Sequence, residues 1–168
     1  MCGIVAVTGY KKALPLLING LEKLEYRGYD SAGIAVINPE TNSITCNRAE
    51  GKLHNLINNL NDENIPGTVG IGHTRWATHG KPELKNAHPH IDGSGTIAVV
   101  QNGIIENFQD LRNKLEKEGI IFNSDTDTEV IPHLIKRELN TLSKLNLENN
   151  GSTLLLSLIH ISEPTRPY

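Results

Sequence analysis

The sequence predicts an α+β domain with antiparallel sheets, and three kinds of stretch carry that prediction. Residues 4–7 form a short apolar run of strand length, and leucines recur at helical spacing between positions 14 and 24. Residues 32–37 and 43–46 are two further strand candidates, separated by a short polar turn. Strands joined by so short a turn pair antiparallel, so we expect antiparallel sheets packed against amphipathic helices.

The composition is that of one globular domain. The chain has 168 residues, of which 38% are hydrophobic and 21% charged, with a formal net charge of -3. These values argue against a disordered or membrane protein, and interspersed charges of both signs give no patch for nucleic acid. Only two cysteines occur, Cys2 and Cys46, and no secretory leader precedes them. We therefore expect a cytoplasmic protein with reduced thiols and neither a membrane nor a nucleic-acid partner.

The positions of proline and glycine and the spacing of apolar residues predict the individual helices and strands. In the first helix Pro15 is tolerable only within the first turn, and Gly28 suits a positive φ after the helix. Asn102 and Gly103 are a strong signal for a two-residue hairpin turn. Pro132 lies inside the last helical pattern, which predicts a kink or a late start. The remaining predicted elements are a helix at 53–60, strands at 68–74 and 96–101, a helix at 108–118 ended by Gly119, a strand at 120–122 and a helix through 130–139.

The N-terminus offers a candidate nucleophile. If an aminopeptidase removes Met1, Cys2 carries a thiol and a free α-amino group on the same residue. An α-amino group titrates near ~7.7–8.0 and can accept the proton of a thiol that titrates near ~8.5. Gly3 would leave room for a substrate, and residues 4–7 read as a buried strand holding the terminus. The alternative is an ordinary buried cysteine.

Two further stretches are candidate substrate contacts. Residues 75–80 and 86–90 bring the only tryptophan, an arginine and three histidines into a short polar region, which predicts a substrate-gripping loop. The Asn102 amide and the Gly103 N–H are suitable donors for an oxyanion, and this role is compatible with a hairpin turn. The simplest role for Asp125 and Asp127 is to cap the N-terminus of the last helix, and we expect one of the two to have only this role.

Six motifs in order resemble the glutaminase domain of the class-II glutamine amidotransferase family, in the form found in glutamine:fructose-6-phosphate aminotransferases (isomerising). The resemblance covers roughly residues 1–140, and the Tyr-Arg-Gly-Tyr-Asp-Ser and Arg-Trp-Ala-Thr-His-Gly forms distinguish it from the phosphoribosyl pyrophosphate and asparagine branches. The motifs occupy residues 1–5, 24–33, 73–80, 86–90, 102–107 and 126–129.

The resemblance implies a fold and a domain boundary. The family has the N-terminal-nucleophile hydrolase fold, a four-layer αββα sandwich of antiparallel sheets. Residues 1–155 would be the N-terminal part of a type-2 glutamine amidotransferase domain, with the sandwich incomplete at its C-terminus because the family domain continues further. Residues 156–168 resemble a translated sequencing-library adapter, so we expect a non-native tail there.

The resemblance also implies the chemistry. Cys2 would attack the side-chain amide of L-glutamine, release ammonia and leave a γ-glutamyl thioester for water to hydrolyse. Asn102 and Gly103 would form the oxyanion hole. Arg75 would hold the substrate α-carboxylate and Asp127 its α-ammonium group. In the parent protein a further isomerase domain would use the ammonia to convert fructose 6-phosphate to glucosamine 6-phosphate; no cofactor is implied, and the parent is expected to be a homo-oligomer.

Four residues have supporting roles by resemblance. Trp76, Thr78 and His79 would belong to the loop that closes over glutamine, with Trp76 also gating the exit of ammonia, and Arg27 would lie near the nucleophile.

Two alternatives remain at this stage. A metal hydrolase could use His73, His79, His88 and His90, but the chain has no His-Glu-x-x-His pattern, so we expect no metal; metal analysis would test this. A truncated fragment could instead retain the site residues without folding, and near-ultraviolet circular dichroism would reveal an unpacked chain.

Overall fold

A computed structural model of the chain describes residues 2–60, 65–77 and 81–144. These residues form antiparallel sheets and helices, which confirms the α+β class. The elements are β1 Gly3–Val7, α1 Ala13–Glu22, the 3-10 helix η1 Glu25–Arg27, β2 Ser31–Ile37, β3 Ile44–Glu50, α2 Leu53–Asn58, β4 Gly70–Arg75, the 3-10 helix η3 Leu84–Asn86, β5 His90–Ile91, β6 Ala98–Val99, α3 Phe108–Lys117 and α4 Val130–Lys144.

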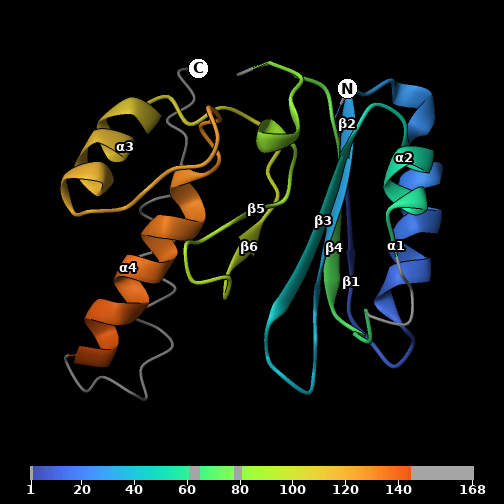
Figure 1. Cartoon of the computed structure of the whole chain (residues 1–168), viewed down its shortest axis with the longest axis horizontal. Helices are drawn as coiled ribbons and strands as arrows, with labels where there is room; N and C mark the ends of the chain where they lie inside the picture. Colours follow the sequence, from blue (N-terminus) through green and yellow to red (C-terminus); the bar gives the residue numbers. More distant parts are fainter. Residues whose placement is uncertain (1, 61–64, 78–80, 145–168) are drawn as a thin grey trace, which may run out of the picture.

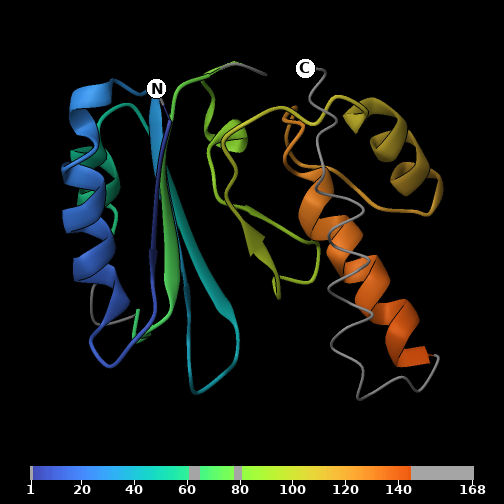
Figure 2. The ribbon, with the colours of Figure 1, turned by 180° about the vertical axis from the view of Figure 1, so that it is seen from behind.

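The main sheet has four antiparallel strands in the order β1-β4-β2-β3. Helices α1 and α2 cover one face of it, as both views show (Figure 1, Figure 2). Leu17 and Leu21 of α1, Ile34 of β2 and Leu56 of α2 are fully buried in the resulting core. The helical spacing of the leucines in the sequence therefore marks the face of α1 that packs on the sheet.

The first strand is less buried than the sequence suggested. We expected residues 4–7 to be a buried strand, but Ile4 is 41% exposed and burial alternates along β1. The reason is that β1 is an edge strand, covered by α1 on one face only. Val5 packs toward α1, where a Cβ on Gly20 would lie 2.7 Å from Val5 Cγ1.

The second half of the chain builds a separate packed layer. β5 and β6 form a two-stranded antiparallel ladder, which lies between the main sheet and α4 (Figure 1). Helices α3 and α4 pack on each other around Leu115, Val130 and Leu134. None of the helices in the described part of the chain is long and apolar enough to cross a membrane.

Among the described residues one expected strand and one hairpin are absent, and a second expected strand is shorter than predicted. The hairpin at Asn102 and Gly103 was a wrong prediction, because the Ile105 N–H donates to Asp127 Oδ2 at 2.7 Å instead of to a partner strand. Residues 120–122 are not a strand either. The strand predicted at 96–101 shrinks to β6, because the N–H groups of Thr96 and Ile97 both donate to Asp92 Oδ1, each at 2.7 Å.

The prolines and glycines expected at the ends of helices occupy the predicted positions. Pro15 and Pro132 fall in the first turns of α1 and α4, which confirms the late start of the last helix. Gly28 and Gly119 have φ values of 72° and 88°, a region that L side chains rarely adopt. These local predictions held because each depends only on neighbouring backbone atoms.

Candidate active site

Cys2 lies directly before β1 and beside the end of β4. Gly3 pairs with Thr74, so the N-terminus runs alongside the last residues of β4. The Trp76 backbone N–H donates to Cys2 Sγ at 3.1 Å, and Sγ lies 3.5 Å from the Trp76 carbonyl oxygen. A Cβ at position 3 would lie 2.7 Å from Leu24 and 2.9 Å from Thr74 Oγ1. The structure thus fixes the thiol at one corner of the main sheet, where Gly3 permits the close fit.

Arg75 is a buried cation one residue before the backbone that holds Cys2. It is 3% exposed, and its Nη1 lies 3.8 Å from Asp30 Oδ1. Asp30 donates its N–H to the Arg75 carbonyl at 2.7 Å and accepts the Ala77 N–H at 2.5 Å. Asp30 therefore fixes the chain on both sides of Trp76, a role that sequence reasoning did not assign.

The turn that follows Arg27 lies against the Trp76 side chain. Arg27 ends η1, and a Cβ on the following Gly28 would lie 3.3 Å from Trp76 Cζ3. The Trp76 side chain is 53% exposed, which is compatible with a covering role. Thr78 and His79, which the sequence also assigns to the covering loop, lie outside the described residues.

Asn102 is tied to β4 by a histidine. His73 Nε2 lies 2.8 Å from Asn102 Oδ1, and His73 is fully buried two residues before Arg75. Burial lowers the pKa of His73 to about 4, although the Asn102 contact and the Gln101 backbone oppose this shift. Asn102 and Gly103 are both exposed, and Gly103 has a φ of 147°. The structure thus attaches the turn to the strand that carries Arg75.

Asp127 supports the same turn from the other side. It is 4% exposed, and its Oδ2 accepts the Ile105 N–H at 2.7 Å. The neighbouring Thr128 hydroxyl donates to Gln101 Oε1 at 3.0 Å. Asp125 instead forms an ion pair with Lys85 at 2.8 Å, so neither carboxylate acts as the simple helix cap that we expected.

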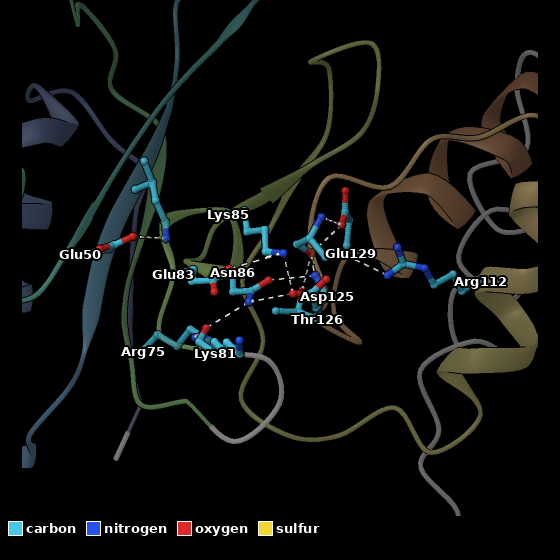
Figure 3. A network of polar contacts seen from close by, with 12 residues as sticks. Glu50, Arg75, Lys81, Glu83, Lys85, Asn86, Arg112, Asp125, Thr126 and Glu129 are labelled. Atoms are coloured by element: carbon cyan, nitrogen blue, oxygen red, sulfur yellow. Dashed lines mark hydrogen bonds and ion pairs between the residues drawn. The ribbon is translucent and has the colours of Figure 1, made fainter.

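A polar network joins Arg75 to Asp125, two residues before Asp127 in the sequence (Figure 3). Arg75 Nη1 donates to the Lys81 carbonyl at 3.4 Å, and Asn86 Nδ2 donates to the same carbonyl at 3.0 Å. Asn86 Oδ1 accepts the Asp125 N–H at 2.8 Å. Asn86 is completely buried, so it links two loops that are far apart in sequence.

Three buried histidines pack edge to face beside the site. The ring centroids of His73 and His88 are 4.4 Å apart, and those of His88 and His90 are 4.6 Å apart. Burial lowers the pKa of all three, to about 3 for His90 and further still for His88. Within the described ranges, which exclude His79, no group of three or more histidine, cysteine or acidic residues could hold a metal ion.

An apolar cavity of about 280 Å³ lies at the opposite end of the main sheet. Its lining includes Ile37, Val69, Ile71 and Ile97. Val69 immediately precedes β4, whereas Cys2 lies beside the other end of that strand. The cavity is therefore separate from the cluster around Cys2.

Comparisons with known proteins identify the family of the chain. A family model described as a glutamine amidotransferase domain matches residues 73–151. A glutamine–fructose-6-phosphate aminotransferase (isomerizing) of Gloeobacter violaceus is 62% identical over 136 residues, which cover 80% of this chain and 22% of that protein. The chain belongs to the glutamine amidotransferase family. Within the family, a protein of the same name from Pyrococcus horikoshii is 47% identical over 174 residues, which cover 100% of this chain and 29% of that one.

Solved structures of the family share the fold. The allosteric regulatory enzyme of purine biosynthesis matches with a TM-score of 0.69 and 31% identity over 82% of this chain and 30% of that one. The glutamine phosphoribosylpyrophosphate amidotransferase of B. subtilis matches with a TM-score of 0.66 and 30% identity over 82% of this chain and 29% of that one. The chain spans about a fifth to a third of the length of these family members.

Proposed function

We propose that this chain carries the glutamine-hydrolysing site of a glutamine:fructose-6-phosphate aminotransferase. The observation that carries the proposal is the position of Cys2 Sγ, which contacts the backbone N–H of Trp76, the residue that follows the buried Arg75. A nucleophile held by the backbone that directly follows a buried arginine suits a substrate that has both a reactive amide and a carboxylate.

The proposed first step forms a covalent intermediate. After removal of Met1, the α-amino group of Cys2 takes the thiol proton, and Sγ attacks the side-chain carbonyl carbon of L-glutamine. Negative charge develops on the carbonyl oxygen, where the Asn102 amide and the Gly103 N–H stabilise it. The amide nitrogen receives the proton and leaves as ammonia. The γ-glutamyl thioester remains on Cys2.

Water then completes the cycle. The α-amino group of Cys2 accepts a proton from water, the hydroxide attacks the thioester carbon, and glutamate and the thiol are released. Arg75 pairs with the α-carboxylate of glutamine throughout and Asp127 with its α-ammonium group. The low exposure of both side chains supports this clamp, because little water competes for their charges.

The remaining proposed roles concern the surroundings of the site. Trp76, Thr78 and His79 cover bound glutamine, Trp76 also gates the exit of ammonia, and Arg27 supports the nucleophile. The ammonia converts fructose 6-phosphate to glucosamine 6-phosphate in a further domain, without a cofactor, in a homo-oligomeric parent protein. Two free cysteines are compatible with a cytoplasmic location, and the layers seen in Figure 1 are compatible with the family's four-layer sandwich.

Replacement of Cys2 tests the proposal. Cys2→Ala should abolish glutaminase activity in the complete protein, and mass spectrometry of the quenched wild type should find a γ-glutamyl adduct on Cys2. Cys46→Ser is the matched control: burial raises the pKa of that thiol, and its Sγ contacts only the Pro89 carbonyl, at 3.8 Å, among the contacts described. Near-normal turnover in Cys2→Ala would overturn the mechanism. An intact mass that retains Met1 would identify an unprocessed chain, for which we expect no activity.

A further inference from the structure

The contact between His73 and Asn102 crosses the candidate site. His73 lies in the middle of β4, where its backbone pairs with Ile4 of β1 and Gly33 of β2. The ring is completely buried, and Nε2 lies 2.8 Å from Asn102 Oδ1. A side chain held by two flanking strands thus contacts a residue in an exposed turn, so the strand can dictate the orientation of the amide.

The direction of this hydrogen bond decides what Asn102 offers a substrate. If Nε2 carries the proton, it donates to Asn102 Oδ1, and the two N–H donors of Nδ2 remain for another group. If Nε2 is unprotonated, the amide must turn to donate its own N–H to the ring. The carbonyl oxygen of Asn102 would then face the reacting centre and repel a developing oxyanion.

Two observations favour a proton on Nε2. His73 is neutral at ordinary pH because burial lowers its pKa to about 4, so the ring has a single N–H. Nδ1 is buried and has no hydrogen bond of acceptable geometry among the described residues. The Gln101 carbonyl acts on the ring but forms no well-aligned hydrogen bond with Nδ1, so a proton on Nδ1 would be a buried donor without a proper acceptor, whereas a proton on Nε2 meets Asn102 Oδ1.

We propose that His73 is a positioning residue, whose neutral Nε2–H tautomer holds Asn102 Oδ1 and so directs Asn102 Nδ2 toward the oxyanion. The inference rests on the proposed glutaminase function and specifies how its oxyanion donor is oriented. His73 touches neither glutamine nor Cys2 in this scheme. It acts only through Asn102.

Nitrogen NMR tests the tautomer without any assay of activity. In the folded protein labelled with ¹⁵N-histidine, the His73 resonances, assigned by their loss in His73→Gln, should show a protonated Nε2 and an unprotonated Nδ1. A protonated Nδ1 with a bare Nε2 would overturn the proposal. This readout is independent of whether the protein hydrolyses glutamine.

Three substitutions test the role in turnover. Gln at position 73 can place an N–H where Nε2 lies, Asn has a similar amide but is one methylene too short, and Leu has no donor. We expect His73→Gln to keep kcat within a few-fold of wild type. His73→Asn and His73→Leu should lower kcat by more than about tenfold with little change in KM, up to the roughly 10²–10³-fold loss expected for Asn102→Ala. Equal kcat for the Gln and Asn variants would contradict the proposal.

A double-mutant cycle separates positioning from general loss of stability. Once Asn102→Ala has removed the amide, His73→Leu should lower kcat little further, because its effect passes through Asn102. His133→Leu is the control, since His133 is 3% exposed in α4 and contacts Phe122 and Glu129 instead. The fold-losses of kcat caused by His133→Leu and by Asn102→Ala should multiply in the double variant. Multiplying effects for His73→Leu would overturn the proposal, whereas an inactive wild type would overturn the glutaminase function and leave the NMR result standing.

Discussion

A single buried amide, that of Asn86, joins the loops next to Arg75 and Asp127. Its Nδ2 donates to the Lys81 carbonyl at 3.0 Å, and its Oδ1 accepts the Asp125 N–H at 2.8 Å. The sequence placed Asn86 in a polar motif near the predicted substrate loop, but its residue type alone did not distinguish a substrate contact from a structural link. Complete burial decides in favour of the structural link.

Asn86→Ala should destabilise the protein. The substitution removes two hydrogen bonds of a fully buried amide, to the Lys81 carbonyl and from the Asp125 N–H, and each such bond typically contributes about 0.5–1.5 kcal/mol. Urea unfolding of the variant and of wild type measures the difference. Lys85→Ala is the control: it removes the ion pair between Lys85 and Asp125, whose side chains are 45% and 54% exposed, and should change stability very little. A stability loss in Lys85→Ala as large as that in Asn86→Ala would contradict this interpretation.

At the scale of elements, the segment before β5 lies directly on β2. A Cβ at Gly33 would be 2.2 Å from the His88 carbonyl oxygen and 3.0 Å from the Asn47 carbonyl oxygen. Only a residue without a side chain permits this approach. The sequence showed a glycine inside a predicted strand, yet it did not show which segment comes close, because that segment lies more than fifty positions away.

Gly33→Ala should therefore be destabilising, by roughly 1–3 kcal/mol as in other overpacked cores, because the chain at His88 must move away from β2. Urea unfolding again provides the measurement. Gly93→Ala is the matched control, since a Cβ there meets nothing within 4 Å and Gly93 has no positive φ. Similar midpoints for the Gly33 variant and wild type would show that the segment adjusts without cost.

Other elements show where local patterns fail. The periodicity of α1 and the positions of Pro15 and Pro132 were sufficient to place two helices, since a helix is closed by contacts within a few residues. The hairpin expected at Asn102 does not form, because the Ile105 N–H donates to the carboxylate of Asp127, which lies twenty-two residues after Ile105. A tertiary hydrogen bond overrides a turn preference here.

At the scale of the whole molecule, three neutral imidazoles lie between the main sheet and the second layer. His73 and His90 have pKa values lowered to about 4 and about 3, mainly by burial, and nearby Arg75 lowers both further. His88 is lowered in the same way, and neither of its ring nitrogens has a hydrogen-bond partner among the described residues. Folding thus requires these rings to remain uncharged.

The protein should lose stability in mild acid. Above the unfolded pKa of 6.5 both states are neutral and the rings cost nothing. Below it the unfolded state binds protons that the folded state cannot, so stability falls by roughly 1.4 kcal/mol per pH unit for each histidine, down to the folded pKa near 4 for His73. Urea midpoints measured at neutral pH and through the mildly acidic range test this. Unchanged midpoints over that range would contradict the prediction, and His88→Leu should make the dependence shallower.

Glu129 extends the acid sensitivity to lower pH. Burial alone would raise its pKa, but the His133 ring, whose Nε2 lies 3.8 Å from Oε1, and hydrogen bonds from the Asn123 N–H and from Ser124 lower it to about 2. Because its folded pKa lies below the usual value of 4.5, its contribution is present above pH 4.5 and lost as the pH falls toward 2. The histidine and carboxylate effects therefore act in succession.

The sequence by itself determined the helices, the prolines and glycines at their ends, the ordered motifs and the candidate nucleophile Cys2, because each of these depends on residues that are close together in the sequence. Only the tertiary structure decided which groups meet. The Trp76 backbone holds Cys2 across 74 positions, His73 contacts Asn102 across 29, and Asp127 reaches Ile105 across 22. Periodicity and turn preference carry no information over such separations, because these contacts depend on how the strands and loops pack in space.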